Sequence, residues 1–335
     1  MAYTTIDDSS EYFTTVLSTS TGSALTIDTG FKPDWLWTKA RNFARSHELH
    51  DTTRGDNKRL KSDATTAEES YSNYLTFTST GATFGTNHNL GYHAEGATTG
   101  VSWAWKANGG TTATNTSGTN IDSTVQANTT AGFSIITYTG TGTDNDSIGH
   151  GLGAVPSMFI IKRRSGTEDW AVYHHKNTSA PETDHLLLNT TDATSDSDTR
   201  FSDQAPSSTV ITLGNNAVVN ANSSTYVCYA FAEIQGYSKF GVYTGNGNAD
   251  GPFVYTGFKP AFFIVKRTDA SGENFVLRDN AVSPINPVNA YVVANDNRAE
   301  ANHYAVDLLS NGFKVRTSES GHNHDGGTYI YMAFA

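Results

Sequence analysis

The sharpest chemical pattern in the sequence is His322-Asn323-His324-Asp325, in which two histidines stand two residues apart. Imidazoles at this spacing on a strand or a loop can share one metal ion. The segment lies between Gly321 and Gly326, where a loop is expected to be polar in any case, and it matches no established ligand signature. We therefore assign no metal ligand from the sequence, and whether His322 and His324 bind a metal is left open.

Carboxylates are the next residues that could do chemistry. A glycan depolymerase would need two of them facing each other across a groove, about 5–9 Å apart. Six are available, but nothing in the sequence pairs them: Glu48, Asp51, Glu168, Asp169, Glu182 and Asp184. The acidic loops at 144–146, 192–198 and 246–251 lack the spaced ligands and closing glutamate of a calcium loop.

Other catalytic signatures are missing from the sequence. It contains no Gly-x-Ser-x-Gly elbow, no metalloprotease helix motif and no phosphate-binding loop. We therefore predict a protein that is not an enzyme, with no catalytic residues and no cofactor. The ligand-binding residues stay unassigned.

Composition limits the classes of partner. Net charge is −11 and charged residues make up only 16% of the 335 residues, so the concentrated basic surface that nucleic acid requires is not expected. Cys228 is the only cysteine, which rules out an internal disulfide. No apolar run approaches the roughly 20 residues of a membrane span, and the first 20 residues do not resemble a secretory signal. We expect no nucleic acid partner, no membrane insertion and synthesis in a cytoplasm.

One motif occurs three times and organises the chain. In each copy a proline is followed six positions later by a lysine, with an apolar run between them. The copies are Gly30–Lys39, Gly153–Arg163 and Gly257–Arg267. A short run that is apolar at consecutive positions, opened by proline, indicates a strand covered on both faces. We expect the lysine to end this strand where the chain returns to water.

A second motif closes each copy: Thr, any residue, Val or Ile, two residues of any type, Ala, and an aromatic residue. It is found at Thr99–Trp105, Thr225–Phe231 and Thr328–Phe334. The distances from Lys39, Lys162 and Lys266 to the respective threonine are 60, 63 and 62 residues. Two motifs at nearly constant separation indicate an internal repeat. Ten residues after each lysine, Leu49, Val172 and Val276 mark a further short strand that we expect to pair with the lysine-bearing strand.

These patterns predict an all-β chain of three tandem related antiparallel β-sandwich (jelly-roll-like) domains. The predicted boundaries are 1–107, 132–233 and 234–335, and the Gly/Thr/Asn/Ser-rich segment 108–131 is predicted to be an extended connector. No such spacer precedes the third domain. We therefore expect domains two and three to pack closely and domain one to be placed more independently.

The repeat also bears on the remaining histidines and aromatic residues. His47 with His50, and His174 with His175, follow equivalent strands, but the third copy has Arg278-Asp279 there, so solvated strand ends explain them better than a shared site. Trp and Phe residues of the predicted strands are expected to pack internally. Four tyrosines nearer loops are candidates for stacking on sugar rings: Tyr71, Tyr74, Tyr237 and Tyr304.

Four longer stretches resemble a known family. They are Gly132–Gly140, Ile148–Gly153, Phe231–Gly241 and Gly327–Ala335. They are similar to a repeated domain of unknown function in virion proteins of marine, cyanophage-like tailed bacteriophages, commonly labelled tail fibre or structural protein. The resemblance covers nearly all of 132–335 and, more loosely, 1–107, where His150-Gly151-Leu152-Gly153 has no counterpart.

The resemblance implies a non-enzymatic virion protein, assembled in the host cytoplasm. A tail fibre or fibre-like appendage that contacts the host cell surface is the leading expectation, with other phage virion proteins and a host surface glycan or protein as partners. A capsid-decorating or head-fibre protein is the alternative, and a glycan depolymerase is third. Analogy with fibres implies a homotrimer, although the sequence shows no coiled-coil heptads.

Overall fold

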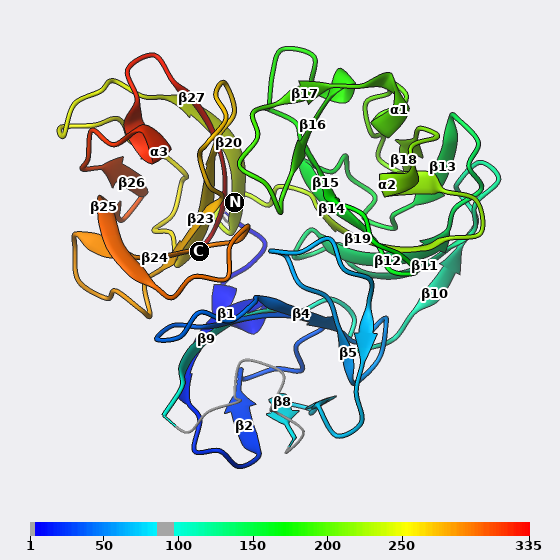
Figure 1. Cartoon of the computed structure of the whole chain (residues 1–335), viewed down its shortest axis with the longest axis horizontal. Helices are drawn as coiled ribbons and strands as arrows, with labels where there is room; N and C mark the ends of the chain where they lie inside the picture. The colour runs from blue at the N-terminus through cyan, green and yellow to red at the C-terminus, as the bar shows by residue number, and fades with distance from the viewer. Residues whose placement is uncertain (1–3, 86–96) are drawn as a thin grey trace.

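The computed structural model describes residues 4–85 and 97–335. Within these ranges the chain forms antiparallel sheets and only short helical turns, so the predicted all-β class is confirmed. Figure 1 shows three lobes arranged around a common centre. We call them unit 1 (strands β1 to β9), unit 2 (β10 to β19) and unit 3 (β20 to β27). The jelly-roll-like connectivity and the exact domain boundaries stay predictions.

Each unit has one main sheet, and four neighbouring strands of that sheet follow the same order in all three units. In unit 1 the order is β1 (Phe13–Thr19), β9 (Thr99–Trp105), β3 (Trp35–Ala40) and β4 (Glu48–Asp51). In unit 2 it is β12 (Phe133–Thr139), β19 (Thr225–Phe231), β14 (Met158–Arg163) and β15 (Trp170–His174). In unit 3 it is β20 (Ser238–Thr244), β27 (Thr328–Phe334), β22 (Phe262–Arg267) and β23 (Val276–Asp279).

The strand register repeats as well. Lys39 lies opposite Val101, Lys162 opposite Val227, and Lys266 opposite Ile330, so the three lysines occupy equivalent places. The strands predicted around Leu49, Val172 and Val276 pair with the lysine-bearing strands as expected. Each of the three sequence copies therefore builds the same sheet.

The remaining strands extend these sheets or form an outer layer. In unit 1 they are β2 (Leu25–Asp28), β5 (Lys58–Arg59), β6 (Glu69–Ser70), β7 (Leu75–Phe77) and β8 (Gly81–Phe84). In unit 2 they are β10 (Ala113–Asn115), β11 (Ser123–Asn128), β13 (Asp146–Gly149), β16 (Asp184–Leu187), β17 (Ser195–Asp196) and β18 (Val210–Leu213). In unit 3 they are β21 (Phe253–Tyr255), β24 (Val288–Val293), β25 (Ala301–Leu309) and β26 (Gly312–Val315).

The helical turns are short. Unit 1 begins with the 3-10 turn η1 (Ser9–Glu11), and unit 2 contains η2 (Pro181–Thr183), α1 (Asp198–Phe201) and α2 (Ala217–Asn220). Unit 3 contains α3 (Ser320–Asn323). Each turn is only three or four residues long, so the sheets define the architecture.

Alternate side chains of each main sheet pack into different cores, which explains why the strands are apolar at consecutive positions. On β3, Trp35 and Trp37 enter one large central core, whereas Leu36 enters the core of unit 1. The central core contains residues from all three units. Its centre is aromatic: the Trp35 ring lies 4.5 Å from Tyr229 of unit 2, and Trp105 lies 5.7 Å from Phe334 of unit 3.

Two expectations about the joints are wrong. The segment 108–131 is no spacer, because β11 pairs with β12 over six residues and β10 pairs with β11, so both strands extend the main sheet of unit 2. Unit 1 is also not placed independently. It supplies four buried tryptophans to the central core, because its sheet presents large aromatic residues that only the other two units can cover.

Candidate functional site

The three repeated lysines are buried where the units meet, which corrects the expectation that they return to water. Each is at most 1% exposed. The ammonium groups donate to backbone carbonyls of the neighbouring unit: Lys39 to Asn297 at 3.2 Å, Lys162 to Thr65 at 2.9 Å, and Lys266 to Thr191 at 3.4 Å. Burial lowers the pKa of each lysine to about 8. Each lysine thus joins its own unit to the preceding one in a closed ring.

The same loops make a second repeated contact. The carbonyl two residues after each lysine accepts a backbone hydrogen bond from the neighbouring unit: Arg41 from Glu300 at 2.7 Å, Arg164 from Glu68 at 2.9 Å, and Thr268 from Thr194 at 2.9 Å. At two of the three interfaces the side chains add an ion pair, Arg41–Glu300 at 2.6 Å and Arg164–Glu68 at 2.9 Å. Thr268 and Thr194 replace the charges at the third.

A third equivalent position ends β4, β15 and β23. Asp51 accepts from the Tyr229 hydroxyl of unit 2 at 2.8 Å, and Asp279 accepts from the Trp103 indole of unit 1 at 3.1 Å. His174 donates to the Tyr331 carbonyl of unit 3 at 3.1 Å. Burial raises the pKa of Asp279 to about 6 despite its hydrogen bonds, and burial lowers the pKa of His174 to about 3. Perturbed pKa values therefore mark contacts between units here, not an open site.

Asp51 also anchors a buried network of charges between units 1 and 2. It pairs with Arg54, whose guanidinium contacts Glu68 at 3.0 Å and the Leu49 carbonyl at 2.9 Å. Burial alone would lower the pKa of Arg54, but the neighbouring acidic groups outweigh it and the pKa is raised. Glu68 then pairs with Arg164 of unit 2. Asp51, one of the six carboxylates that the sequence offered for catalysis, therefore helps to join two units.

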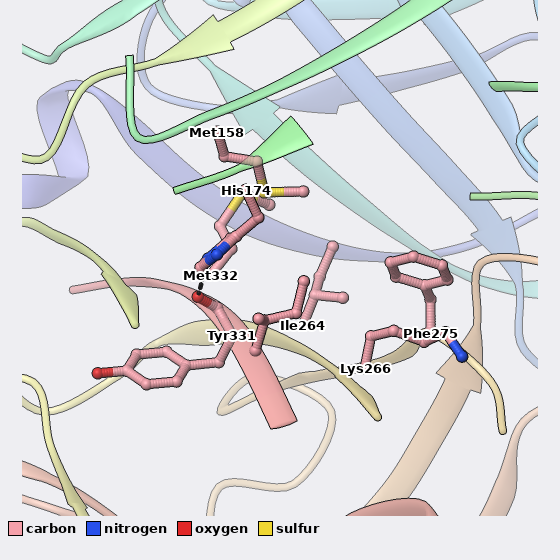
Figure 2. A pocket seen from close by; sticks show the side chains of 8 residues that line it. Met158, His174, Ile264, Lys266, Phe275, Tyr331 and Met332 are labelled. Carbon is pink, nitrogen blue, oxygen red and sulfur yellow. Dashed lines mark hydrogen bonds between the residues drawn. The ribbon is translucent and has the colours of Figure 1, made fainter. Parts of the chain in front are cut away.

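The space beside His174 is too small for a ligand. Figure 2 shows His174 pointing at the Tyr331 carbonyl, with Met158, Ile264 and Met332 around it. The cavity they line has a volume of only about 10 Å³, roughly the room of one water molecule. It is a packing gap between units 2 and 3.

The two histidines of 322–325 do not converge. His322 is fully buried and its Nε2 accepts from Arg278 at 2.6 Å, while His324 is exposed. Burial lowers the pKa of His322 well below its usual value. Within 4–85 and 97–335, no group of three or more His, Cys, Asp or Glu side chains is placed to hold a metal ion.

Asn323, which lies between the two histidines, has a structural role. Its side chain holds the loop at 246–251 through Asn246 and Asn248, at 2.7 Å and 2.6 Å. Asn220 of unit 2 does the same for Thr141 and Thr143. Both asparagines stand five residues before the closing threonine, a sequence signal that the motif analysis missed.

Of the four histidines at the equivalent strands, His47, His174 and His175 bind a carbonyl of another unit, so these three are not solvated strand ends. His47 accepts from the Trp37 indole at 2.8 Å and contacts the Val293 carbonyl of unit 3 at 2.8 Å. His175 donates to the Phe240 carbonyl of unit 3 at 2.9 Å. His50 stays within unit 1, where it contacts the Lys58 carbonyl at 2.7 Å.

The six carboxylates are scattered. Glu48 is buried against Arg59 and Tyr74; burial alone would raise its pKa, but hydrogen bonds and the nearby cation lower it to about 2. Asp51 belongs to the network described above, Glu168 pairs with Arg163, and Asp169 accepts from Asn189. Asp184 is buried against Thr178, and Glu182 lies in η2. The structure brings no two of the six together across a groove in the ranges it describes.

Two acidic loops do meet. Asp144 and Asp198 line a hollow of about 140 Å³ with Thr199, Ser202 and Asn215. Asp144 accepts from the Ser202 hydroxyl at 2.7 Å. The third acidic loop, 246–251, lies in another unit and is held by Asn323.

The tryptophans of the predicted strands are buried as expected, whereas tyrosines that were candidates for sugar stacking are buried as well. Trp35, Trp37, Trp103 and Trp105 are buried, which confirms that they pack internally. Tyr237 and Tyr74 are buried too, so neither presents a ring to a sugar. The side chain of Tyr304 lies outside the described residues. Instead, Phe253 and Tyr255 of β21 are exposed, at 46% and 58%.

Two hollows on the described surface lie along β20. One, of about 470 Å³, lies between units 2 and 3 and is lined by Ser157, His175, Lys176, Glu233, Lys239, Phe240, Gly241, Val242 and Tyr331. The other, of about 370 Å³, reaches from β20 to β21 and is lined by Glu233, Gln235, Gly236, Ser238, Lys239, Tyr255, Thr256 and Gly257. Both contain the Lys239–Glu233 ion pair, at 2.6 Å. This edge is the best candidate binding surface.

The sequence matches a family described as Domain of unknown function (DUF7483) over residues 8–335. Because the match spans nearly the whole chain, the protein belongs to that family. Comparison with curated proteins and with solved structures gave no match. None of the helices in the described residues has the length and apolar character to span a membrane.

Proposed function

We propose that this chain is a non-enzymatic virion protein of a tailed bacteriophage, a tail fibre or fibre-like appendage that contacts the host cell surface. The observation that carries the proposal is that the repeated ionisable side chains are buried as contacts between units. Lys39, Lys162, Lys266, Asp51 and Asp279, with the arginines beside them, are buried as links between units. This arrangement favours a rigid body with loops free for contact over a catalytic cleft.

The resemblance of residues 132–335 to repeated virion domains supplies the biological setting. Repeated units with polar, weakly charged loops can offer several weak contacts, and linked contacts multiply affinity. Host surface glycans or proteins and other virion proteins are the proposed partners, and the virion is the proposed location. A homotrimer, by analogy with fibres, is part of this proposal.

The alternative, a capsid-decorating or head-fibre protein, is favoured by one observation. The chain repeats its interface contacts three times around a common centre, so one copy has near-threefold geometry. Such a body fits a threefold position on a particle without needing two more copies.

Imaging of intact virions, at a resolution that places the chain, tests the proposal. We expect density for the three-lobed body on the tail and binding of the fluorescently labelled protein to isolated host envelopes. Density on the head together with no envelope binding would favour the capsid protein. Release of reducing sugars from host polysaccharide would favour a depolymerase. Native mass spectrometry of the purified chain tests the trimer.

A further inference from the structure

Among the described residues no strand pairs with the outer edge of β20, which ends the main sheet of unit 3. Tyr237 and Gly245, at its two ends, bond to the segment around β27, at 2.8 Å each. Backbone groups alternate in direction along an antiparallel strand, so those of Ser238, Phe240, Val242 and Thr244 point away from β27. This edge borders the 470 Å³ and 370 Å³ hollows.

Side chains cover only the first half of the edge. The Phe240 amide donates to the Glu233 carboxylate at 3.3 Å, and its carbonyl accepts from His175 at 2.9 Å. At the start of the strand, the backbone amide of Ser238 donates to the backbone carbonyl of Ile234 at 2.9 Å. The outward backbone groups of Val242 and Thr244 have no hydrogen-bond partner in the part of the chain that the structure describes, and the Val242 side chain is 43% exposed.

The equivalent edge in unit 2 is occupied by a strand. Ile135 on β12 lies opposite Tyr229, four residues after the closing threonine, as Phe240 lies opposite Met332. There β11 pairs with β12, with Gln126 opposite Ile135 and Thr124 opposite Thr137. The strand β11 thus satisfies the same outward groups that β20 leaves to side chains or to solvent.

The residues that face this edge from the neighbouring unit also occupy equivalent positions: unit 1 faces β11, and unit 2 faces β20. Gln126 of β11 donates to the hydroxyls of Thr52 and Thr53 in unit 1, at 2.9 Å and 2.8 Å. Those threonines follow Asp51 as His175 and Lys176 follow His174, and Asp51 and His174 occupy the same register. His175 and Lys176 line the hollow beside β20. The hollow therefore lies where β11 would lie in unit 3.

We propose that this cleft binds an extended strand of a partner polypeptide, which pairs antiparallel with β20 as β11 pairs with β12. The strand displaces the caps that Glu233 and His175 place on Phe240 and pairs with Val242 and Thr244. Because Lys176 and His175 replace two threonine hydroxyls, the partner carries a carboxylate where β11 carries Gln126. Strand addition of this kind takes affinity from main-chain bonds and specificity from alternate side chains. The proposal stands apart from the virion role and does not depend on it.

The probe is a synthetic peptide with the sequence of residues 119–130 carrying Gln126→Glu, added to the full chain. Fluorescence anisotropy measures binding, and amide hydrogen exchange locates it. We expect exchange at Val242 and Thr244 to slow by about tenfold or more at saturation. The unchanged peptide, with Gln126, is expected to bind about fivefold more weakly, since charge-assisted hydrogen bonds are stronger than neutral ones.

Backbone pairing is tested without altering the protein. Methylation of the peptide amide at position 124, which points at β20, is expected to weaken binding by about tenfold, because a blocked donor leaves the Val242 carbonyl unpaired. Methylation at position 125, which points away, is the matched control and is expected to change affinity by less than about twofold. Lys176→Glu in the protein should weaken binding of the peptide that carries Glu at position 126 and should leave binding of the peptide with Gln126 unchanged.

Three results would overturn the proposal. They are no binding at millimolar peptide, equal effects of the two methylations, and protection on β12 in place of β20. The last would show that the peptide exchanges with β11 in unit 2.

Discussion

Unit 2 contacts unit 1 on one side and unit 3 on the other. The two interfaces share the same backbone contacts but differ in their side-chain contacts and in whether a strand lies in the groove. Both have the buried lysine and the loop hydrogen bond two residues after it. The first adds the Asp51–Arg54–Glu68 network and the inserted strand β11. The second has His174 on a carbonyl, a small apolar gap and an open cleft.

This difference shows which parts of a repeated interface are interchangeable. The lysine and the backbone bonds join strands that every copy must have, so they recur. Side chains at the ends of β4 and β15 face different neighbours in each pair of units, so they differ. A strand was available to fill the groove only where the chain between two units was long enough, at 108–131.

The largest effect is expected from Arg54→Met. Removing the guanidinium leaves Asp51 buried without a cation, whereas Glu68 keeps Arg164; breaking a buried pair in this way typically costs about 3–5 kcal/mol. Asn177, which stands three residues after His174 as Arg54 stands after Asp51, is the matched position, and Asn177→Ala is expected to cost only about 1 kcal/mol. Urea unfolding at pH 7 measures both. Similar losses for the two variants would contradict the contrast between the interfaces.

Gln126→Ala tests how firmly β11 joins units 1 and 2. The side chain bonds to Thr52 and Thr53 and accepts from the Gly110 amide at 2.7 Å. Losing these bonds in a buried setting is expected to cost about 1–3 kcal/mol of unfolding free energy. The exposed neighbour Thr124 is the control, since Thr124→Ala should change stability by less than about 0.5 kcal/mol. If both variants unfold at the same urea concentration, β11 adds no bond of consequence at that interface.

The shared lysines predict a pH dependence. The folded pKa of Lys266 is about 8 and the unfolded value is 10.5, so between these values the unfolded state keeps a proton that the folded state has lost. Unfolding free energy therefore rises with pH in this window, by about 1–2 kcal/mol per lysine from pH 8 to 9.5. Lys266→Met and Lys162→Met should each reduce this rise in unfolding free energy by the contribution of one lysine, as measured by urea titrations at the two pH values. A rise as steep in either variant as in the wild type would count against the buried lysine.

The smallest effect concerns the exposed ion pairs. Arg41–Glu300 is partly exposed, so a double-mutant cycle with alanine is expected to give a coupling of about 0.5–1 kcal/mol. Thr268→Arg with Thr194→Glu should install a pair of similar strength at the interface that lacks one. High salt should weaken both couplings. A transplanted pair with no coupling would mean that the loops differ in more than side chains.

The sequence determined the repeat, the all-β class and the strands that bear the motifs. Spacing and alternation are local properties, and a strand apolar at consecutive positions must be covered on both faces wherever it lies. Only the tertiary structure decided what does the covering. The sequence predicts Lys39 to be a polar strand end and 108–131 to be a spacer, because neither pattern shows that another unit lies beside it. The burial and shifted pKa of Lys39 arise from how the units meet, and that depends on contacts between residues far apart in the chain.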